Sequence, residues 1–348
     1  MRIDLRSDTV TTPTPEMRKA MAEAEVGDDV YGEDPTIRRL EEKAAGLLGK
    51  EEGVYVPSGT MGNLVAVMTH TVRGNEIILE AESHIYYYEV GGFAVAAQVL
   101  PRTIAGDRGF FTVRDLATNL RSPNLHFPVP VLVCPENTHN RAGGSVWPQE
   151  QFDAVAQAAH RAGLLVHLDG ARVFNAAVYL GRPAAEVARH ADSVMFCLSK
   201  GLSAPVGSVL VGTKDFIARA RKNRKILGGG MRQAGVIAAA GLVALDTMID
   251  RLAEDHANAR VLAEGLAGIE GLAVDLGGVQ TNMVMCRVDG LGVAAPDFVK
   301  LLTSQGVLTN AVDPRRVRLV THKDVSSADV KRALALIAEA AKEARRVA

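Results

Sequence analysis

The sequence predicts an α/β fold, with a mainly parallel sheet flanked by helices and a smaller C-terminal α+β domain. Two observations support this class. Short apolar runs alternate with helical stretches up to residue 250, the order that strand–helix–strand units produce. Several runs lack polar alternation, as strands do when helices cover both faces of a parallel sheet. At 348 residues the chain is long for one hydrophobic core, so two domains are expected.

The N-terminal segment, residues 1–35, is polar and rich in turn residues. We expect it to form an arm with one short helix, Pro15 to Glu25, and no strand of a sheet. A helical pattern then runs from Pro35 until Gly49 stops it. Gly53 to Val56 is a short apolar strand, and helical spacing resumes after it.

Further strands and helices follow in alternation. The expected strands of the larger domain are Ile77 to Leu79, Gln98 to Leu100, Val129 to Cys134, Leu164 to Leu168, Val194 to Leu198 and Ser208 to Val211. Helices between them include Gly92 to Ala97 and Gln149 to Arg161. An alanine-rich stretch from Ala234 to His256 predicts one long helix between the domains, which we place at 36–250 and 251–348.

The smaller domain is expected to mix strands and helices. Its elements are Val274 to Leu276, Met283 to Val288, Ala295 to Gln305, Val317 to Val320 and a closing helix, Ser327 to Val347.

Composition excludes several classes of function. The net charge is −1 and basic residues do not cluster, so a nucleic-acid partner is not expected. No apolar run has the length of a membrane span or a signal peptide. Cys134, Cys197 and Cys286 are widely spaced and indicate reduced core residues of a cytoplasmic protein. The spacing of Cys and His predicts no dedicated metal site.

Small hydroxyl and glycine residues join the strand ending at Val56 to the next helix, in the order Ser58-Gly59-Thr60. Free backbone N–H groups at that helix start, together with the Ser58 and Thr60 hydroxyls, would hold a phosphate group. The alternative is an ordinary helix N-cap.

Asp169 closes the strand Leu164 to Leu168, at the edge where open α/β sheets place their ligands. A carboxylate there can pair with a protonated pyridine nitrogen and keep the ring electron-withdrawing. The alternative is that Asp169 simply pairs with Arg172 at a helix start.

Lys200 follows the next apolar run, Val194 to Leu198. A lysine at the end of a buried strand is costly unless its amine has a function, because desolvation favours the neutral, nucleophilic amine. We therefore hypothesise that Lys200 carries a Schiff base of pyridoxal 5'-phosphate. The alternative is a solvated charge at the sheet edge. Three candidate groups thus follow successive strand ends: a phosphate-binding turn, an acid for the ring nitrogen and an amine. All three together are less expected by chance than any one of them.

Motifs along essentially the whole chain carry a resemblance to a known family. They are Ile3–Thr11, Gly27–Pro35, Pro57–Asn63, Ser83–Glu89, Glu136–Asn140, His167–Arg172, Leu198–Leu202, Gly228–Gln233 and Arg318–His322. On these motifs the chain resembles the low-specificity L-threonine aldolases (L-allo-threonine aldolases) of the aspartate-aminotransferase-like superfamily. The resemblance implies the fold-type I architecture of pyridoxal phosphate-dependent transferases.

The resemblance also implies a role for individual residues. Lys200 would form the Schiff base, Asp169 would bind the pyridine nitrogen and His84 would stack on the ring. Gly59 and Thr60, with Ser58 beside them, would hold the phosphate. The implied clamp for the substrate carboxylate consists of Ser7, Arg172 and Arg318, with Arg172 also close to the cofactor.

Three further residues are assigned through the resemblance. His126 matches a family histidine near the substrate hydroxyl, with a simple loop residue as the alternative. Lys225 and Arg232 would approach the cofactor phosphate from a neighbouring subunit, because fold-type I active sites lie at subunit interfaces. A homodimer is therefore the minimum assembly, and tetramers are typical of the family.

The implied reaction is retro-aldol cleavage of L-threonine, L-allo-threonine and related β-hydroxy-α-amino acids. It yields glycine and an aldehyde, through an external aldimine and a glycine quinonoid. The base could be His84, His126 or a bound water. Transamination or β-elimination on the same scaffold remains a rival, as does a non-catalytic regulatory protein. A dinucleotide-binding dehydrogenase is not expected, because no Gly-x-Gly-x-x-Gly follows an early strand.

Overall fold

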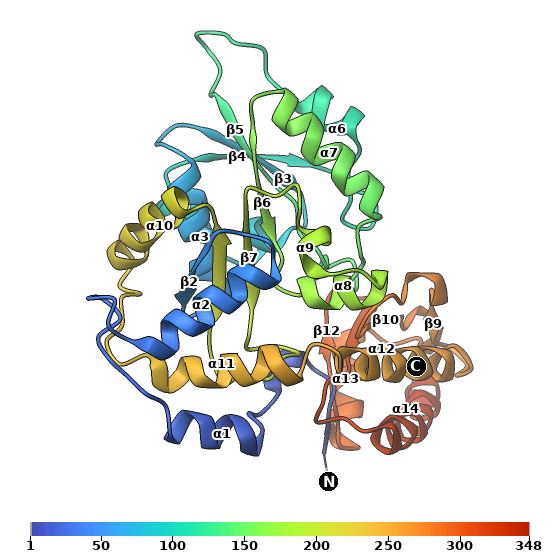
Figure 1. The fold of residues 1–348 in the computed structure, drawn as a ribbon. Coiled ribbons are helices and arrows are strands. Elements are labelled where there is room, and N and C mark those ends of the chain that lie inside the picture. Colours follow the sequence, from blue (N-terminus) through green and yellow to red (C-terminus); the bar gives the residue numbers. More distant parts are fainter. Residues whose placement is uncertain (1, 348) are drawn as a thin grey trace.

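A computed structural model of the protein describes residues 2–347 and is built around a seven-stranded sheet (Figure 1). Across the sheet the strands are β2 (Glu52–Val56), β8 (Ser208–Gly212), β7 (Ser193–Cys197), β6 (Leu165–Asp169), β5 (Pro130–Cys134), β3 (Glu76–Glu80) and β4 (Leu100–Ile104). The pairs from β4 to β7 are parallel, and β8 is antiparallel to both of its neighbours. The prediction of a mainly parallel sheet is confirmed.

Helices cover both faces of this sheet. The helices of this part are α1 (Pro15–Ala22), α2 (Pro35–Leu47), α3 (Gly59–His70), α4 (His84–Tyr87), α5 (Gly92–Val95), α6 (Val113–Asn119), α7 (Gln149–Arg161), α8 (Val173–Leu180), α9 (Ala184–Val187), α10 (Lys214–Ile226) and α11 (Gly235–Thr247). Alternate strand residues face opposite cores: Phe196 belongs to the core that includes residues of α2, α7, α8 and α11, whereas Met195 belongs to the core that includes residues of α3 and α10. Burial on both faces explains why the strands have uninterrupted apolar runs.

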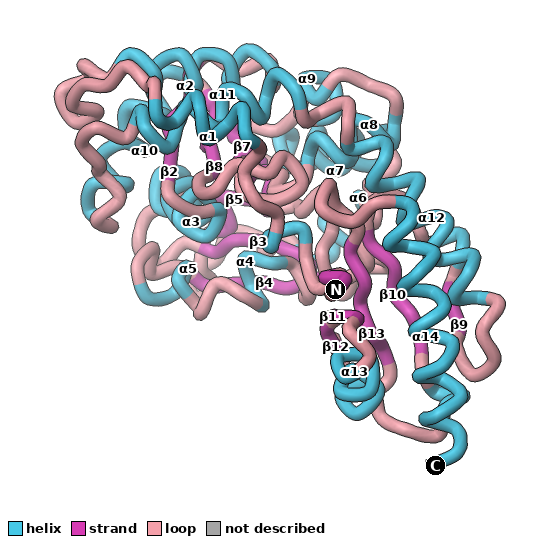
Figure 2. The backbone as a smooth tube through the Cα atoms, turned by 90° about the horizontal axis from the view of Figure 1, so that it is seen from below, coloured by secondary structure: helices cyan, strands magenta, loops and turns pink. Residues whose placement is uncertain are grey.

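A second hydrophobic core is formed by the C-terminal part of the chain, which lies beside the large sheet (Figure 2). It contains an antiparallel sheet in the order β12 (Asn310–Ala311), β13 (Arg316–Val320), β10 (Met283–Arg287) and β9 (Ala273–Val274). The helices α12 (Leu252–Ala267), α13 (Ala295–Ser304) and α14 (Ser327–Val347) pack with it, together with short 3-10 turns at Leu276–Gly278 and Asp289–Leu291. None of the helices within residues 2–347 has the length and apolar character needed to cross a bilayer.

The N-terminal segment departs from its prediction. Ile3–Asp4 form a strand, β1, that pairs in parallel with β11 (Val307–Leu308), and a 3-10 turn follows at Asp8–Val10. No strand pattern is visible in the sequence, because the pairing spans only two residues and the buried side chains Ile3 and Leu5 belong to the second core. The expectation of an arm outside any sheet was therefore wrong.

The predicted long helix from Ala234 to His256 is two helices, α11 and α12, separated at residues 248–251. Helix α11 packs in the first core, whereas α12 contributes residues from Ala259 onward to the second core. The chain changes direction between two cores, and neither glycine nor proline marks the break. The domain boundary at residue 250 remains a prediction.

Strand β4 begins at Leu100, which is the last residue of the predicted run Gln98 to Leu100. It is an edge strand with mostly exposed or half-buried side chains, and an edge position tolerates Pro101. An apolar run is therefore not required there, and the predicted strand began two residues before the observed one.

Candidate active site

The carboxyl edge of the large sheet gathers residues from several elements. Strand β6 ends at Asp169, Lys200 follows the end of β7, and the chain leaves β2 into helix α3 at the same edge (Figure 1). A cavity of about 130 Å³ lies between them. Its lining residues are Gly59, Thr60, Asn63, His84, Glu89, Asp169, Ala171, Met195 and Lys200. Five of the predicted site residues therefore share one cavity.

The start of α3 lies close to strand β7. Ser58 is the N-cap of this helix, and its Oγ accepts the backbone N–H of Met61 at 3.1 Å. The N-cap that the sequence left as an alternative is therefore present, but the first N–H groups of any helix still lack partners within it. A Cβ at Gly62 would lie 2.6 Å from Met195 Cγ, so glycine is needed for this close packing.

Asp169 is buried and its carboxylate is held by two donors. Oδ1 accepts the backbone N–H of Ala171 at 3.1 Å, and Oδ2 accepts Asn63 Nδ2 at 2.9 Å. The carboxylate does not pair with Arg172, so that alternative was wrong. These two hydrogen bonds fix the orientation of Asp169 beside the cavity.

His84 begins the short helix α4 and is held at two points. Its Nδ1 lies 2.8 Å from Glu89 Oε1, and its backbone N–H donates to Glu136 Oε2 at 2.7 Å. Burial lowers the pKa of His84, but the hydrogen bond to Glu89 and the charge of Asp169 outweigh it, so the pKa lies above its ordinary value. Burial, reinforced by repulsion from Asp169, raises the pKa of Glu89.

Arg172 makes a buried, two-pronged pair with Asp8. Its Nε and Nη2 donate to the two Asp8 oxygens, each at 2.7 Å, and Asn282 Nδ2 donates to the same carboxylate at 3.3 Å. Burial opposes ionisation of Asp8, but Arg172 holds the pKa of that carboxyl well below its usual range. Ser7 directly precedes Asp8 and is the N-cap of a short 3-10 turn.

Arg318 differs from Arg172 because no carboxylate within residues 2–347 pairs with it. Its Nη1 donates to Asn140 Oδ1 at 2.8 Å, and its Nη2 donates to the Arg6 carbonyl at 3.3 Å. Its Nε is buried and has no hydrogen-bond partner among the described residues. Burial and the positive charge of Arg172 lower the pKa of Arg318. Of these two neighbouring guanidinium groups only Arg172 pairs with a carboxylate, so the site can accept an anion at Arg318.

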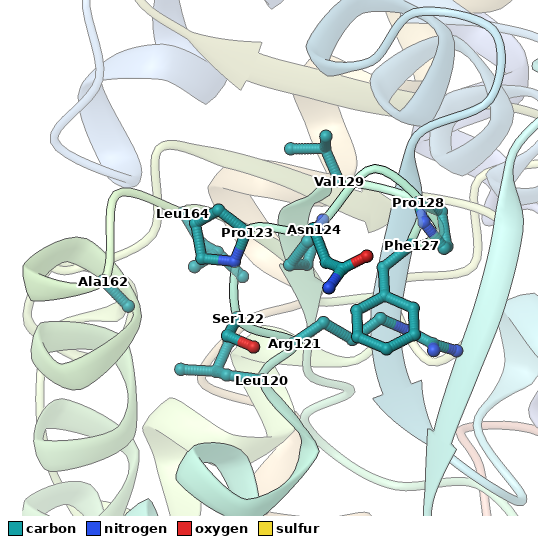
Figure 3. Close-up of a pocket in the computed structure, with 11 residues that line it drawn as sticks. Leu120, Arg121, Ser122, Pro123, Asn124, Phe127, Pro128, Val129, Ala162 and Leu164 are labelled. Atoms are coloured by element: carbon teal, nitrogen blue, oxygen red, sulfur yellow. The ribbon is translucent and has the colours of Figure 1, made fainter.

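Seven of the predicted residues do not line this cavity. Four of them make the contacts described above, namely Ser7, Ser58, Arg172 and Arg318, and the other three lie elsewhere. His126 is in the exposed loop that leads into β5, at the amino ends of the parallel strands and opposite Asp169. Residues 120–124 and 127–130 line a separate pocket of about 440 Å³ with Ala162 and Leu164 (Figure 3), and His126 is not among its lining residues. Lys225 lies in the last turn of α10, and the exposed Arg232 pairs with Asp28 at 2.9 Å.

Several residues that shape the site were missed as functional candidates. They are Asp8, Asn63, Glu89, Glu136 and Asn140. All five stand inside motifs that carry the family resemblance, so the motifs located them but did not indicate their roles. The one available signal was polarity: Asn63 is a polar residue directly before the apolar run Leu64 to Met68.

His84, Glu89 and Asp169 also offer three ligand atoms within 4.8 Å of one another, so by position they could hold a metal ion. However, Glu89 Oε1 and Asp169 Oδ2 both already accept hydrogen bonds from Asn63 Nδ2, at 2.8 and 2.9 Å. The amide therefore holds the two carboxylates together without a cation. The absence of a dedicated metal site stays a prediction.

Comparisons with known proteins agree with this architecture. Residues 4–289 match the family described as beta-eliminating lyase. The low-specificity L-threonine aldolase 1 of Arabidopsis thaliana is 46% identical over 343 residues, which cover 97% of this chain and 96% of that protein.

Solved structures share the fold. The threonine aldolase of Leishmania major superimposes with a TM-score of 0.83 at 20% identity, covering 97% of this chain and 99% of that one. SPT with a PLP internal aldimine superimposes with a TM-score of 0.77 at 19% identity, covering 99% and 88% of the two chains. The fold-type I prediction is confirmed, and the chain belongs to the beta-eliminating lyase family, among the low-specificity L-threonine aldolases.

Proposed function

We propose that this chain cleaves L-threonine, L-allo-threonine and related β-hydroxy-α-amino acids to glycine and an aldehyde, with pyridoxal 5'-phosphate as its cofactor. For threonine the aldehyde is acetaldehyde. The membership in the L-threonine aldolases supports the reaction class. The structural observation that carries the proposal is Arg318, a half-buried arginine close to Arg172. Its Nε is buried without a hydrogen-bond partner, and no carboxylate within residues 2–347 pairs with it.

The residues at the cavity fit the cofactor. Lys200 supplies the amine that would bond its aldehyde carbon, and the oriented carboxylate of Asp169 would pair with its ring nitrogen. The unpaired N–H groups at the start of α3, with Thr60, would hold its phosphate. When bound, the cofactor withdraws electrons from the α-carbon of an amino acid and so weakens the bonds at that carbon.

The protein's own residues then bind and orient the substrate. Arg318 and Ser7 bind the carboxylate of the amino acid, and Arg172, held rigidly by Asp8, completes the positive site. Anchoring that group limits rotation of the substrate and so selects which bond of the α-carbon is cleaved.

Cleavage requires that the β-hydroxyl loses a proton as the aldehyde leaves and that the α-carbon gains one to give glycine. His84 lines the cavity and, together with bound water, is the candidate for this proton transfer. His126 lies at the opposite edge of the sheet, so it can take part only from another copy of the chain.

The direct test incubates the purified protein with L-threonine and with L-allo-threonine, with and without pyridoxal phosphate. We expect cofactor-dependent formation of glycine and acetaldehyde in equal amounts. Lys200→Ala is the inactive reference, and Lys214→Ala, which changes an exposed lysine at the start of α10, is the matched control. Absence of acetaldehyde with a cofactor-loaded protein would rule out the proposed reaction.

A second candidate reaction is β-elimination, favoured by the name of the matching family. With threonine it would give a 2-oxo acid and ammonia instead of glycine and aldehyde. Measuring ammonia and 2-oxobutanoate in the same incubation separates the two reactions. If only one reaction occurs, its own two products account for all the threonine consumed.

We also propose a cytoplasmic homo-oligomer with shared active sites, at least a dimer and, as is typical of the family, a tetramer. The support is that His126, Lys225 and Arg232 do not line the cavity of their own chain. The family resemblance implies a position near the substrate hydroxyl for His126 and near the cofactor phosphate for Lys225 and Arg232. Light scattering should give a mass of two or four subunits. Mixing inactive Lys200→Ala and Arg232→Ala proteins should restore activity if Arg232 acts across an interface, because some hybrid sites would contain both native residues.

A further inference from the structure

The Asn63 side chain lies at the centre of a buried network beside the cavity. Its Nδ2 donates to Glu89 Oε1 at 2.8 Å and to Asp169 Oδ2 at 2.9 Å. Its Oδ1 lies 3.1 Å from His167 Nε2. Asn63 and His167 are both completely inaccessible to solvent. One amide thus connects the carboxylate beside His84 with the carboxylate proposed to bind the cofactor's ring nitrogen.

The direction of each hydrogen bond follows from the chemistry of this amide. An asparagine amide has two hydrogens, and both are given to carboxylate oxygens, so Oδ1 can only accept. His167 must then donate from Nε2, and its Nδ1 accepts from the Ser193 hydroxyl at 2.8 Å. The Ser193 oxygen in turn accepts from His70 Nε2 at 2.7 Å. Burial, reinforced by His70, lowers the pKa of His167 to about 3, in agreement with a neutral ring.

This network determines which nitrogen of His84 carries a proton. Glu89 Oε1 accepts from Asn63 and lies 2.8 Å from His84 Nδ1. Because a carboxylate only accepts, Nδ1 is the protonated nitrogen of a neutral His84, and Nε2 remains available. A histidine oriented in this way by a carboxylate is the arrangement that activates general bases in other enzymes.

We propose that Glu89 is a positioning residue that holds the proton on Nδ1 of His84, and that Asn63 couples this pair to Asp169. The inference deepens the proposed function, since it concerns how His84 and the cofactor-binding carboxylate are prepared. The charged groups around His84 are Glu89 on its own segment, Asp169 at the end of β6, Glu136 after β5 and Lys200 after β7. Only Glu89 contacts the ring nitrogen of His84 among the described residues.

The first test uses nitrogen-15 NMR of the histidine side chains in protein free of cofactor, which does not depend on activity. In the unmodified protein, neutral His84 should carry its proton on Nδ1. Glu89→Gln removes the negative charge, so the midpoint for protonation of His84 should move to lower pH. Asn63→Asp adds a negative charge to the network, so the midpoint should move to higher pH.

Glu42→Gln, which makes the same change on the exposed surface of α2, should leave that midpoint unchanged. Opposite shifts in Glu89→Gln and Asn63→Asp would support the coupling. If both variants fold and neither shifts the midpoint, the proposal is overturned. A proton on Nε2 of neutral His84 in the unmodified protein would overturn it without any variant.

The second test measures the cofactor-loaded enzyme. Glu89→Gln should lower kcat about tenfold or more, while KM for threonine changes little, because Glu89 does not touch the substrate carboxylate site. The acid limb of the pH profile should move in the same direction as the NMR midpoint. The two proposals can fail separately. If neither the native protein nor any variant cleaves threonine but the NMR midpoints shift as expected, the proposed reaction is wrong and the positioning role of Glu89 is still supported.

Discussion

At the scale of single residues, the carboxylate-binding part of the site depends on an unequal charge balance. Burial and the positive charge of Arg172 lower the pKa of Arg318, and Asp8 pairs directly with Arg172 but not with Arg318. A bound substrate carboxylate would supply the missing negative charge. The affinity for amino acids should therefore depend strongly on Arg318.

Arg318→Gln should raise KM for L-threonine by about tenfold or more, because a charge-assisted hydrogen bond to a carboxylate contributes about 1.5–3 kcal/mol. The affinity for pyridoxal phosphate should change little. Arg316→Gln on the same strand is the matched control, since Arg316 pairs with Asp313. An unchanged KM in Arg318→Gln would show that the carboxylate binds elsewhere.

Asp8→Asn should destabilise the protein by about 3–5 kcal/mol at neutral pH, because it leaves the buried Arg172 without its counter-ion. The pKa of Asp8 is lower in the folded protein than its ordinary value of 3.8. Its contribution is therefore complete above that value and is lost as the pH falls toward the folded pKa. Denaturant unfolding should show that wild type and Asp8→Asn differ less and less below about pH 3.8.

A second buried pair provides the control for this change. Asp29 binds Arg224 at 2.7 Å, with both side chains nearly inaccessible. Asp29→Asn should also lose stability, but only Asp8→Asn should raise KM for the amino acid. Equal effects of both variants on KM would contradict a role of Asp8 at the site.

At the scale of secondary-structure elements, the approach of α3 to β7 positions the phosphate site. The helix contains Gly62, where a side chain would collide with Met195. Helix propensity favours alanine over glycine by about 1 kcal/mol, but overpacking costs about 1–3 kcal/mol. In Gly62→Ala the gain in helix propensity therefore opposes the cost of overpacking. The cost is the larger of the two, so the substitution should be destabilising.

Gly62→Ala should lower the thermal stability and weaken pyridoxal phosphate binding, because the helix start moves away from Lys200. Gly46→Ala on α2 is the matched control, since a Cβ there meets no atom within 4 Å. That variant should be stabilised by about 0.4–1 kcal/mol and bind the cofactor normally. Calorimetry and a cofactor titration distinguish the two outcomes.

At the scale of the whole molecule, the site joins three parts of the chain. Asp8 in the N-terminal segment binds Arg172 beside the large sheet and Asn282 beside the second core. The segment is anchored by Leu5, whose backbone bonds to Leu308 and Val320 and whose side chain is fully buried. Correct placement of Ser7 and Asp8 should therefore depend on Leu5.

Leu5→Ala should cost about 2–5 kcal/mol of stability and also raise KM for L-threonine. Ile337→Ala, which shortens a buried side chain on α14 in the same core, should lower stability without the effect on KM. Kinetics at a temperature where both variants are folded make the comparison. An equal KM in the two variants would show that the N-terminal segment is not specifically required.

The sequence by itself determined the fold class, the positions of most strands and the motif residues at the sheet edge. It did so because burial on both faces of a parallel sheet leaves uninterrupted apolar runs, and because Asp169 and Lys200 follow such runs directly. Motif resemblance also located Ser7, His84 and Arg318. The local sequence around each of these residues was sufficient to locate it.

Only the tertiary structure decided which polar groups are partners. Asp8 binds Arg172 across 164 residues, and Asn63 joins Asp169 across 106, so neither pairing leaves a local pattern. The strand at Ile3–Asp4 and the break between α11 and α12 likewise arise from contacts with a second core. Burial makes an unpaired charge costly, and the folded chain alone determines which distant donor satisfies each buried carboxylate.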